Sequence, residues 1–188
     1  MPSDTAADLQ HYLHQSRTSL LASLDGLSEY DCRRPMTPTG TNLLGLVKHL
    51  AGLELSYLGD CVGRPSGVTL PWFEDGSVWD NADMWATADQ SRDYLVELYL
   101  TAARHADESI ASLPLDAPAS VSWWPRPATT LGHLLVRVVA ETAQHAGHAD
   151  ILRELIDGRA ASGRDDIGDD AHWAEYVERI QAAADTYR

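Results

Sequence analysis

Apolar residues recur at every third or fourth position over long parts of this chain, and this spacing restricts the fold more than any other feature. The clearest stretch runs from about Thr129 to Asp157 and is followed by Gly158, a residue that suits the C-terminal cap of a helix. Its apolar residues on one helical face are Leu131, Leu134, Leu135, Val138, Ile151, Leu152 and Leu155. The spacing predicts a long amphipathic helix.

Four further segments show the same periodicity. They run from about Thr5 to Leu27, from Thr41 or Asn42 to Cys61, from Thr87 to Leu113 and from Asp170 to Ala184. Loops rich in proline and glycine separate them, and no stretch predicts a strand of credible length. We therefore expect an all-α fold: a four-helix bundle with an additional C-terminal helix packed outside it. The 188 residues suit a single domain 1–188, with a core over about 5–158 and a linker and C-terminal helix over 159–188.

Charge excludes one class of partner. The net charge is −14, and no cluster of Lys or Arg offsets it locally, so we expect no nucleic-acid partner. No apolar run reaches the length that a bilayer requires, so we expect no membrane partner. The polar start, from Met1 to Asp4, does not resemble a secretory signal and favours a cytoplasmic location, where Cys32 and Cys61 would be reduced thiols.

Three ionisable residues interrupt the apolar face of the segment 129–157. Glu141, His145 and His148 follow the leucines at three- and four-residue spacing, and burying them without partners would cost free energy. A carboxylate and a neutral imidazole are both metal ligands, and positions four apart on a helix can meet at one ion. The spacing alone leaves open whether Glu141 or His148 joins His145 as a ligand.

A third ligand is available on the segment 42–61. His49 lies between Leu46 and Leu53, on the flank of the face that we expect to point inward. An isolated histidine there also suits a core position, so the pattern by itself does not decide between packing and ligation. Three protein ligands would leave a coordination position for water or substrate, which is typical of a catalytic site.

Two stretches together resemble the DinB-like superfamily, and in particular its mini-circle-like branch. They are residues 40–54 (GTNLLGLVKHLAGLE) and 141–154 (ETAQHAGHADILRE), and the likeness extends over about Leu9 to Gly158. The resemblance implies a four-helix bundle with a three-ligand metal site. Many members have two histidines on the last bundle helix, whereas Glu141 replaces the first of them here. This arrangement is similar to that of the mycothiol-dependent maleylpyruvate isomerases, and it implies His49, Glu141 and His145 as the ligands of one divalent metal ion.

The same resemblance implies a function. Zinc is the expected metal, with nickel or another divalent ion as alternatives, and a low-molecular-weight thiol of the mycothiol type is the expected co-substrate. We therefore expect a zinc-dependent thiol S-transferase or isomerase that acts on an electrophilic small molecule, as a monomer or homodimer. The same three ligands would also suit a metal-dependent hydrolase or a metal-binding protein without turnover. The pattern identifies no further catalytic residue.

Two aromatic loops could cover such a site. Trp72 and Phe73 follow the second helical segment, and Trp123 and Trp124 precede the segment 129–157. Long loops in compact domains are often functional, so we expect these loops to lie over the open position of the metal. The alternative is that the tryptophans close the ends of the bundle.

Overall fold

The computed structural model describes residues 4–159 and 169–188, and it confirms the all-α prediction. Four long helices form the bundle: α1 (Thr5–Ala22), α3 (Leu43–Tyr57), α5 (Arg92–Ser112) and α6 (Leu131–Asp157). The first helix is shorter than predicted, because the chain turns through Ser23 and Gly26 before the short helix α2 (Glu29–Arg33). Gly26 has a φ of 74°, in the left-handed region that favours glycine.

Polar side chains fix where the bundle helices begin. Asp4, Asn42, Ser91 and Thr130 each accept a hydrogen bond from a backbone N–H of the first turn that has no partner within the helix. At the other end of α6, Gly158 has a φ of 75° and donates its backbone N–H to the carbonyl of Glu154. The predicted cap of this helix is therefore present.

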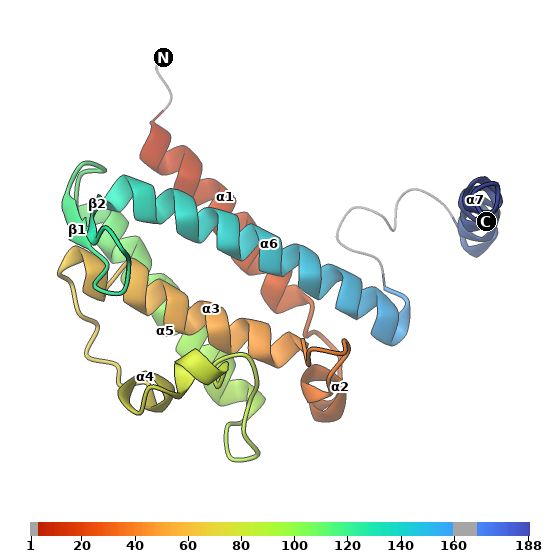
Figure 1. Ribbon diagram of the computed structural model, residues 1–188, viewed down its shortest axis with the longest axis horizontal. Coiled ribbons are helices and arrows are strands. Elements are labelled where there is room, and N and C mark those ends of the chain that lie inside the picture. Colours follow the sequence, from red (N-terminus) through yellow and green to blue (C-terminus); the bar gives the residue numbers. More distant parts are fainter. Residues whose placement is uncertain (1–3, 160–168) are drawn as a thin grey trace.

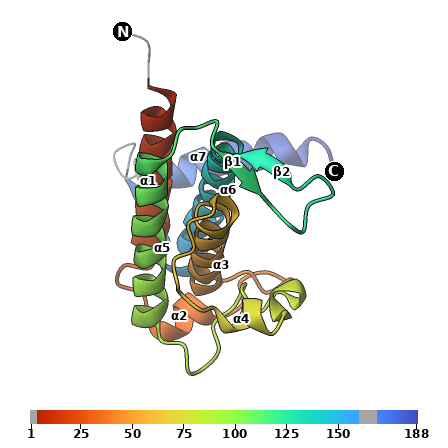
Figure 2. The same cartoon turned by 90° about the vertical axis from the view of Figure 1, so that its left-hand side faces the viewer.

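The four helices pack in two pairs. Helix α1 lies along α6, and α3 lies along α5, while α3 also contacts α6 (Figure 1). The view turned by 90° shows α1 and α5 on one side of the bundle and α3 beside α6 (Figure 2). Leucines from all four helices meet in the core, among them Leu20, Leu50, Leu95 and Leu134, each 0% exposed.

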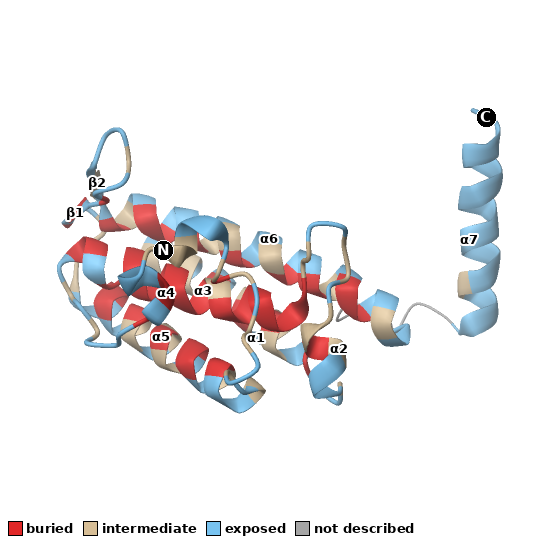
Figure 3. Cartoon of the chain, turned by 60° about the horizontal axis from the view of Figure 1, so that its bottom comes forward, coloured by how far each residue is buried: buried red, intermediate tan, exposed pale blue. Residues whose placement is uncertain are grey.

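Helix α3 is the central helix. Every residue of it is buried except His49 (Figure 3). This departs from the amphipathic pattern that we predicted, because the chain between α3 and α5 covers the side of α3 that faces away from the bundle. His49 is thus the place where the covering of α3 opens.

The covering segment contains three short helical turns: η1 (Asp60–Val62), α4 (Pro71–Glu74) and η2 (Ser77–Asp80). Two glycines of α3 allow this covering segment to approach the helix closely. A Cβ atom on Gly45 would lie 1.8 Å from the carbonyl oxygen of Met84, and one on Gly52 would lie 2.9 Å from the ring of Phe73. A side chain at Gly45 would therefore displace the backbone of this segment.

Lys48 of α3 binds the backbone of the same segment. Its side chain is buried and donates hydrogen bonds to the carbonyl oxygens of Ala82, at 2.5 Å, and Trp85, at 2.9 Å. Its ammonium also lies 4.3 Å from the centre of the Trp72 ring. Burial lowers the pKa of Lys48, and the hydrogen bonds and ring supply the contacts that a buried ammonium requires.

A small hairpin precedes α6. Strands β1 (Pro118–Ser120) and β2 (Ala128–Thr130) pair antiparallel, so the loop that holds Trp123 and Trp124 is the turn of this hairpin. The sequence predicted no strand here, because three-residue strands are too short to show a periodicity of two. Figure 2 shows the hairpin projecting from the end of the bundle at which α6 begins.

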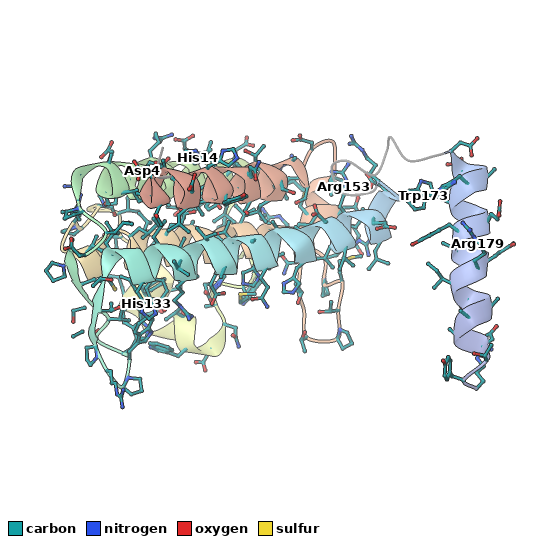
Figure 4. All side chains as sticks on the ribbon, turned by 90° about the horizontal axis from the view of Figure 1, so that it is seen from above. Asp4, His14, His133, Arg153, Trp173 and Arg179 are labelled. Atoms are coloured by element: carbon teal, nitrogen blue, oxygen red, sulfur yellow. The ribbon has the colours of Figure 1, made fainter. Side chains whose placement is uncertain are left out.

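The predicted C-terminal helix is present as α7 (Asp170–Asp185). It lies apart from the bundle, and none of its residues is buried, so the expected packing against the bundle is absent in this structure (Figures 3 and 4). Residues 160–168 of the predicted linker lie outside the described part of the chain. Over the described residues, every helix is too short or too polar to cross a membrane.

Candidate metal centre

His49 is held by a carboxylate from the covering segment. Its Nδ1 atom lies 2.7 Å from Oδ2 of Asp83, a residue that is 7% exposed. An ionised carboxylate accepts the proton of Nδ1, which leaves the lone pair of Nε2 available to a metal ion. Asp83 thus sets both the tautomer and the direction of the ring.

The other two predicted ligands come from α6. Glu141 and His145 are half-buried and four residues apart, with Oε2 of Glu141 3.7 Å from Nε2 of His145. The rings of His49 and His145 lie 5.0 Å apart between centroids and nearly perpendicular, at 76°. One ligand atom from each of His49, Glu141 and His145 lies within 4.8 Å of the other two. The structure therefore brings the three residues together.

This donor set fits a divalent ion. Two imidazoles and one carboxylate are common catalytic zinc ligands, and bonds of about 2.0–2.2 Å would place tetrahedral donor atoms about 3.3 Å apart. The observed spread of up to 4.8 Å is wider than this, so the side chains would have to draw their donor atoms together around an ion. Both helices that carry the ligands, α3 and α6, are packed parts of the bundle.

The protonation state of His145 favours ligation. Burial disfavours its charged form, and the neighbouring His49 and His148 add to this effect, so the pKa of His145 falls from 6.5 to about 4 in the metal-free protein. The imidazole is therefore neutral at pH 7. A metal ion can bind it without displacing a proton.

His148 lies outside the three-residue cluster. It is exposed, and its Nδ1 atom lies 3.3 Å from Nδ1 of His145, whereas Glu141 faces the other ring nitrogen, Nε2. Between the two alternatives that the spacing left open, the geometry favours Glu141. His148 is instead placed to contact the ring of a ligand.

The buried face of α6 differs from the predicted one. It runs through Val138, Thr142, Ala146 and Ala149, so Glu141 and His145 lie on its flank rather than among the leucines. The flank position matters because it lets the two side chains reach the opening at His49 while one edge of each stays accessible.

A pocket of about 390 Å³ opens beside the cluster. His49, Asp83 and Glu141 line one part of it, and aromatic side chains form much of the rest: Tyr57, Phe73, Trp79 and Trp123. Apolar walls with a few convergent polar groups are typical of small-molecule sites. The two aromatic loops thus contribute to the pocket beside the metal site.

The individual aromatic residues differ from our expectation. Phe73 and Trp123 line the pocket, whereas Trp72 is buried in the core over Lys48. Trp124 packs against Tyr57 and against His133, which Figure 4 places near the start of α6. Trp79, from η2, is 72% exposed and forms an outer wall.

Arg137 is one of the pocket residues that the sequence did not indicate. It lies one turn before Glu141 on α6, and its Nη2 atom is 3.0 Å from Oε1 of that residue. The guanidinium also lies over the rings of Tyr57 and Trp124, at 5.3 and 5.7 Å from their centres. An arginine on the polar side of a helix does not by itself indicate a functional residue. The sequence feature that could have indicated Arg137 is its position four residues before the candidate ligand Glu141.

Neither cysteine is a candidate nucleophile. Cys32 and Cys61 are both buried and free of disulfides. Burial raises the pKa of the Cys61 thiol to about 11 and also raises that of Cys32, so both are protonated at neutral pH. A reaction that uses a thiolate in this protein would therefore take it from a bound small molecule.

Comparison with known proteins identifies the family. A sequence model of the mycothiol-S-transferase family matches residues 8–158, and no curated protein matches the chain. The chain is also similar in structure to a conserved protein from Enterococcus faecalis, with a TM-score of 0.63 and 13% identity over 84% of this chain and 99% of that one. The latter likeness shows the fold alone. The match over 8–158 includes the four bundle helices apart from the first three residues of α1, and the chain belongs to the mycothiol-S-transferase family of the DinB-like superfamily.

Proposed function

We propose that the protein is a zinc-dependent S-transferase that joins mycothiol, or a closely related small thiol, to an electrophilic co-substrate. The observation that carries the proposal is the cluster of His49, Glu141 and His145 at the wall of an aromatic pocket. The family to which the chain belongs supports the choice of thiol.

A metal ion held by these three residues would leave a coordination position and would lower the pKa of a thiol bound there. Asp83 keeps His49 in the tautomer that ligation needs, because it accepts the proton of Nδ1. Tyr57, Phe73 and Trp79 would exclude water from the co-substrate. In a substitution, the thiol sulfur bonds to the electrophilic carbon, the leaving group departs with its bonding electrons, and the thiol proton passes to solvent. In an addition to a conjugated double bond, the π bond breaks as the sulfur–carbon bond forms, and a proton ends on the product.

The pocket favours transfer over hydrolysis. Many metal-dependent hydrolases add a free carboxylate or imidazole that takes a proton from the metal-bound water. Among the described pocket residues, the carboxylates are Glu141 and Asp83. The first is a candidate ligand paired with Arg137, and the second is committed to His49. A thiol ionises far more readily than water, so a nearby metal ion makes its ionised form accessible at neutral pH without the help of such a base.

Elemental analysis and cobalt substitution would test the proposal. We expect about one zinc ion per chain in the purified protein. In the cobalt-substituted protein, mycothiol should produce a sulfur-to-cobalt charge-transfer band, while its S-methyl derivative should not. The His49→Ala variant is the control and should show no band.

Turnover is measured separately, as formation of the thioether from mycothiol and 1-chloro-2,4-dinitrobenzene with release of chloride. If no thiol changes the absorption spectrum of the cobalt-substituted protein, and if the protein hydrolyses test esters or amides, the hydrolase would be favoured. Stoichiometric metal without a thiol response or any turnover would identify a metal-binding protein instead.

A further inference from the structure

The pocket beside the metal cluster contains one strong cation. Arg137 lines it, and among the described lining residues no other Arg or Lys is present. The guanidinium is held in place by three neighbours: the carboxylate of Glu141 and the rings of Tyr57 and Trp124. This fixed position distinguishes Arg137 from an ordinary surface arginine, whose long side chain samples many rotamers.

The contacts of Arg137 leave donors unused. A guanidinium carries five N–H donors, and it binds a carboxylate best through two parallel hydrogen bonds. Among the described residues, Glu141 is the one carboxylate within ion-pair distance, and its contact is through a single nitrogen at 3.0 Å. The Arg137 side chain is 41% exposed, so part of its donor edge is open to a ligand.

The charge balance of the site favours an anion. Glu141 and Asp83 contribute two negative charges to the pocket, while a divalent ion and Arg137 would contribute three positive ones. The zinc-loaded pocket would therefore carry a local excess of one positive charge before a thiolate binds, although the whole chain has a net charge of −14. The surrounding walls are aromatic, which suits a flat apolar body.

We propose that Arg137 binds the carboxylate of an aromatic or conjugated electrophile in this pocket, and so selects anionic co-substrates over neutral ones. The inference rests on the proposed transferase function for the identity of the bound molecule as an electrophile. Recognition of the carboxylate itself is a binding event and can be measured without turnover.

Binding is tested with an unreactive matched pair. 4-Methyl-3-nitrobenzoate and 4-methyl-3-nitrobenzamide have nearly the same shape and differ in charge, and both can be titrated calorimetrically into the zinc-loaded protein. We expect the carboxylate to bind about 10- to 100-fold more tightly, the range typical of a charge-assisted hydrogen-bonded pair. In Arg137→Gln, this preference should fall to about threefold or less, while Arg137→Lys should keep an intermediate preference because it retains the charge but loses the planar fork.

Arg104→Gln is the matched control. Arg104 is also an exposed arginine that pairs with a glutamate on its own helix, Glu97, but it lies on α5 and does not line this pocket. The variant should keep the full preference for the carboxylate. If Arg137→Gln also keeps it, the carboxylate is held by the metal ion and the proposal is wrong.

A purely structural role for Arg137 predicts a different pattern. If the residue only orients Glu141, Arg137→Gln would lower zinc occupancy and weaken both members of the pair equally. Zinc content of each variant, measured by elemental analysis, and the ratio of the two affinities together separate the roles. Normal zinc with a lost preference supports carboxylate recognition; reduced zinc with an unchanged ratio overturns it.

Turnover separates this proposal from the proposed function. With 4-chloro-3-nitrobenzoate, the thiol sulfur bonds to the ring carbon that bears chlorine, chloride leaves with its bonding electrons, and the thiol proton goes to solvent. Faster reaction of this acid than of its amide, lost in Arg137→Gln, supports both proposals. A binding preference without any turnover would support the carboxylate site and contradict the transferase function. Equal turnover of acid and amide would support the transferase function and contradict the carboxylate site. A preference that follows a carboxylate on the thiol, tested with 3-mercaptopropionate and its amide, would overturn the assignment to the electrophile.

Discussion

Replacement of Asp83 by Ala should weaken metal binding without removing a ligand. The carboxylate accepts a hydrogen bond from His49 at 2.7 Å, and the two side chains are 10% and 23% exposed, so little water is available to take over the role of the carboxylate. Loss of a group that orients a ligating histidine typically lowers metal affinity about 10- to 100-fold. This range corresponds to about 1.4–2.7 kcal/mol of binding free energy.

The same change should appear in thermal unfolding. A metal ion that binds only the folded state stabilises it by an amount that depends on the ratio of free metal to Kd, so at saturating zinc the variant loses the full 1.4–2.7 kcal/mol, again as an approximate range. For a chain of this size, each kcal/mol shifts Tm by about 2–4 °C. We therefore expect the zinc-loaded variant to melt about 3–11 °C lower than the zinc-loaded parent, in addition to any difference between the two metal-free proteins.

Thermal unfolding is followed by circular dichroism with zinc and with chelator, and Kd is measured by competition with a chelating dye. Asp83→Asn keeps an acceptor for His49 and should fall between the parent and Asp83→Ala. Asp80→Ala is the control, because Asp80 is an exposed acid of the same segment that does not line the pocket. Equal losses of Tm with and without zinc, or an unchanged Kd, would refute the role assigned to Asp83.

Three further predictions concern the cluster. His49→Ala, Glu141→Ala and His145→Ala should each abolish stoichiometric metal in elemental analysis, while His148→Ala should retain it; the opposite result for Glu141 and His148 would exchange their roles. Chelation should lower Tm yet leave the far-ultraviolet circular dichroism helical, since the leucine core does not involve the ion, and complete unfolding would indicate a structural metal. In the folded metal-free protein, His145 stays neutral down to about pH 4, whereas in the unfolded chain it takes up a proton near pH 6.5. The free energy of unfolding of the chelated protein, measured with urea, should therefore fall as the pH is lowered from about 6.5 to about 4. The variant His145→Gln should show a weaker dependence on pH in this range.

The number and order of the bundle helices could be predicted from the sequence because each carries a long apolar repeat. Their ends could not. Ile151 and Leu155 were expected in the core but are 60% and 65% exposed, because the buried side of the last turns of α6 runs through Leu152 and Arg153. Arg153 is buried there instead and donates a hydrogen bond to the carbonyl of Ser23, next to the end of α1.

Buried charge is the second feature that periodicity missed. Arg17 is 6% exposed and pairs with Glu54, which is 0% exposed, through two hydrogen bonds between α1 and α3. Asp107 of α5 accepts a third hydrogen bond from the same guanidinium. A reading based on apolar spacing assigns such residues to the surface, because it considers each helix alone and cannot see that charges on three helices satisfy one another.

The metal cluster and its surroundings differed in how far they could be predicted. The three candidate ligands lie on two helices, and the fixed geometry of a helix lets spacing and family resemblance indicate them. Asp83 and Trp79 come from the segment between α3 and α5, whose path depends on tertiary contacts. Gly45, Gly52 and Lys48, the one lysine of the sequence, all contact this segment. Their roles can be recognised only when the path of the covering segment is known.

This division between helices and covering segment has a consequence for specificity. The ligand atoms are fixed by α3 and α6, whereas Phe73 and Trp79, which shape the pocket, belong to a segment fixed to α3 at Gly45 and Lys48. Substitutions at Phe73 or Trp79 would therefore change which co-substrates fit while leaving the three ligands in place. Substitution of Gly45 would act differently, because displacing the backbone at Met84 would also move the adjacent Asp83 away from His49. Metal affinity in this protein should thus be more sensitive to a methyl group at Gly45 than to the loss of an entire indole ring at Trp79.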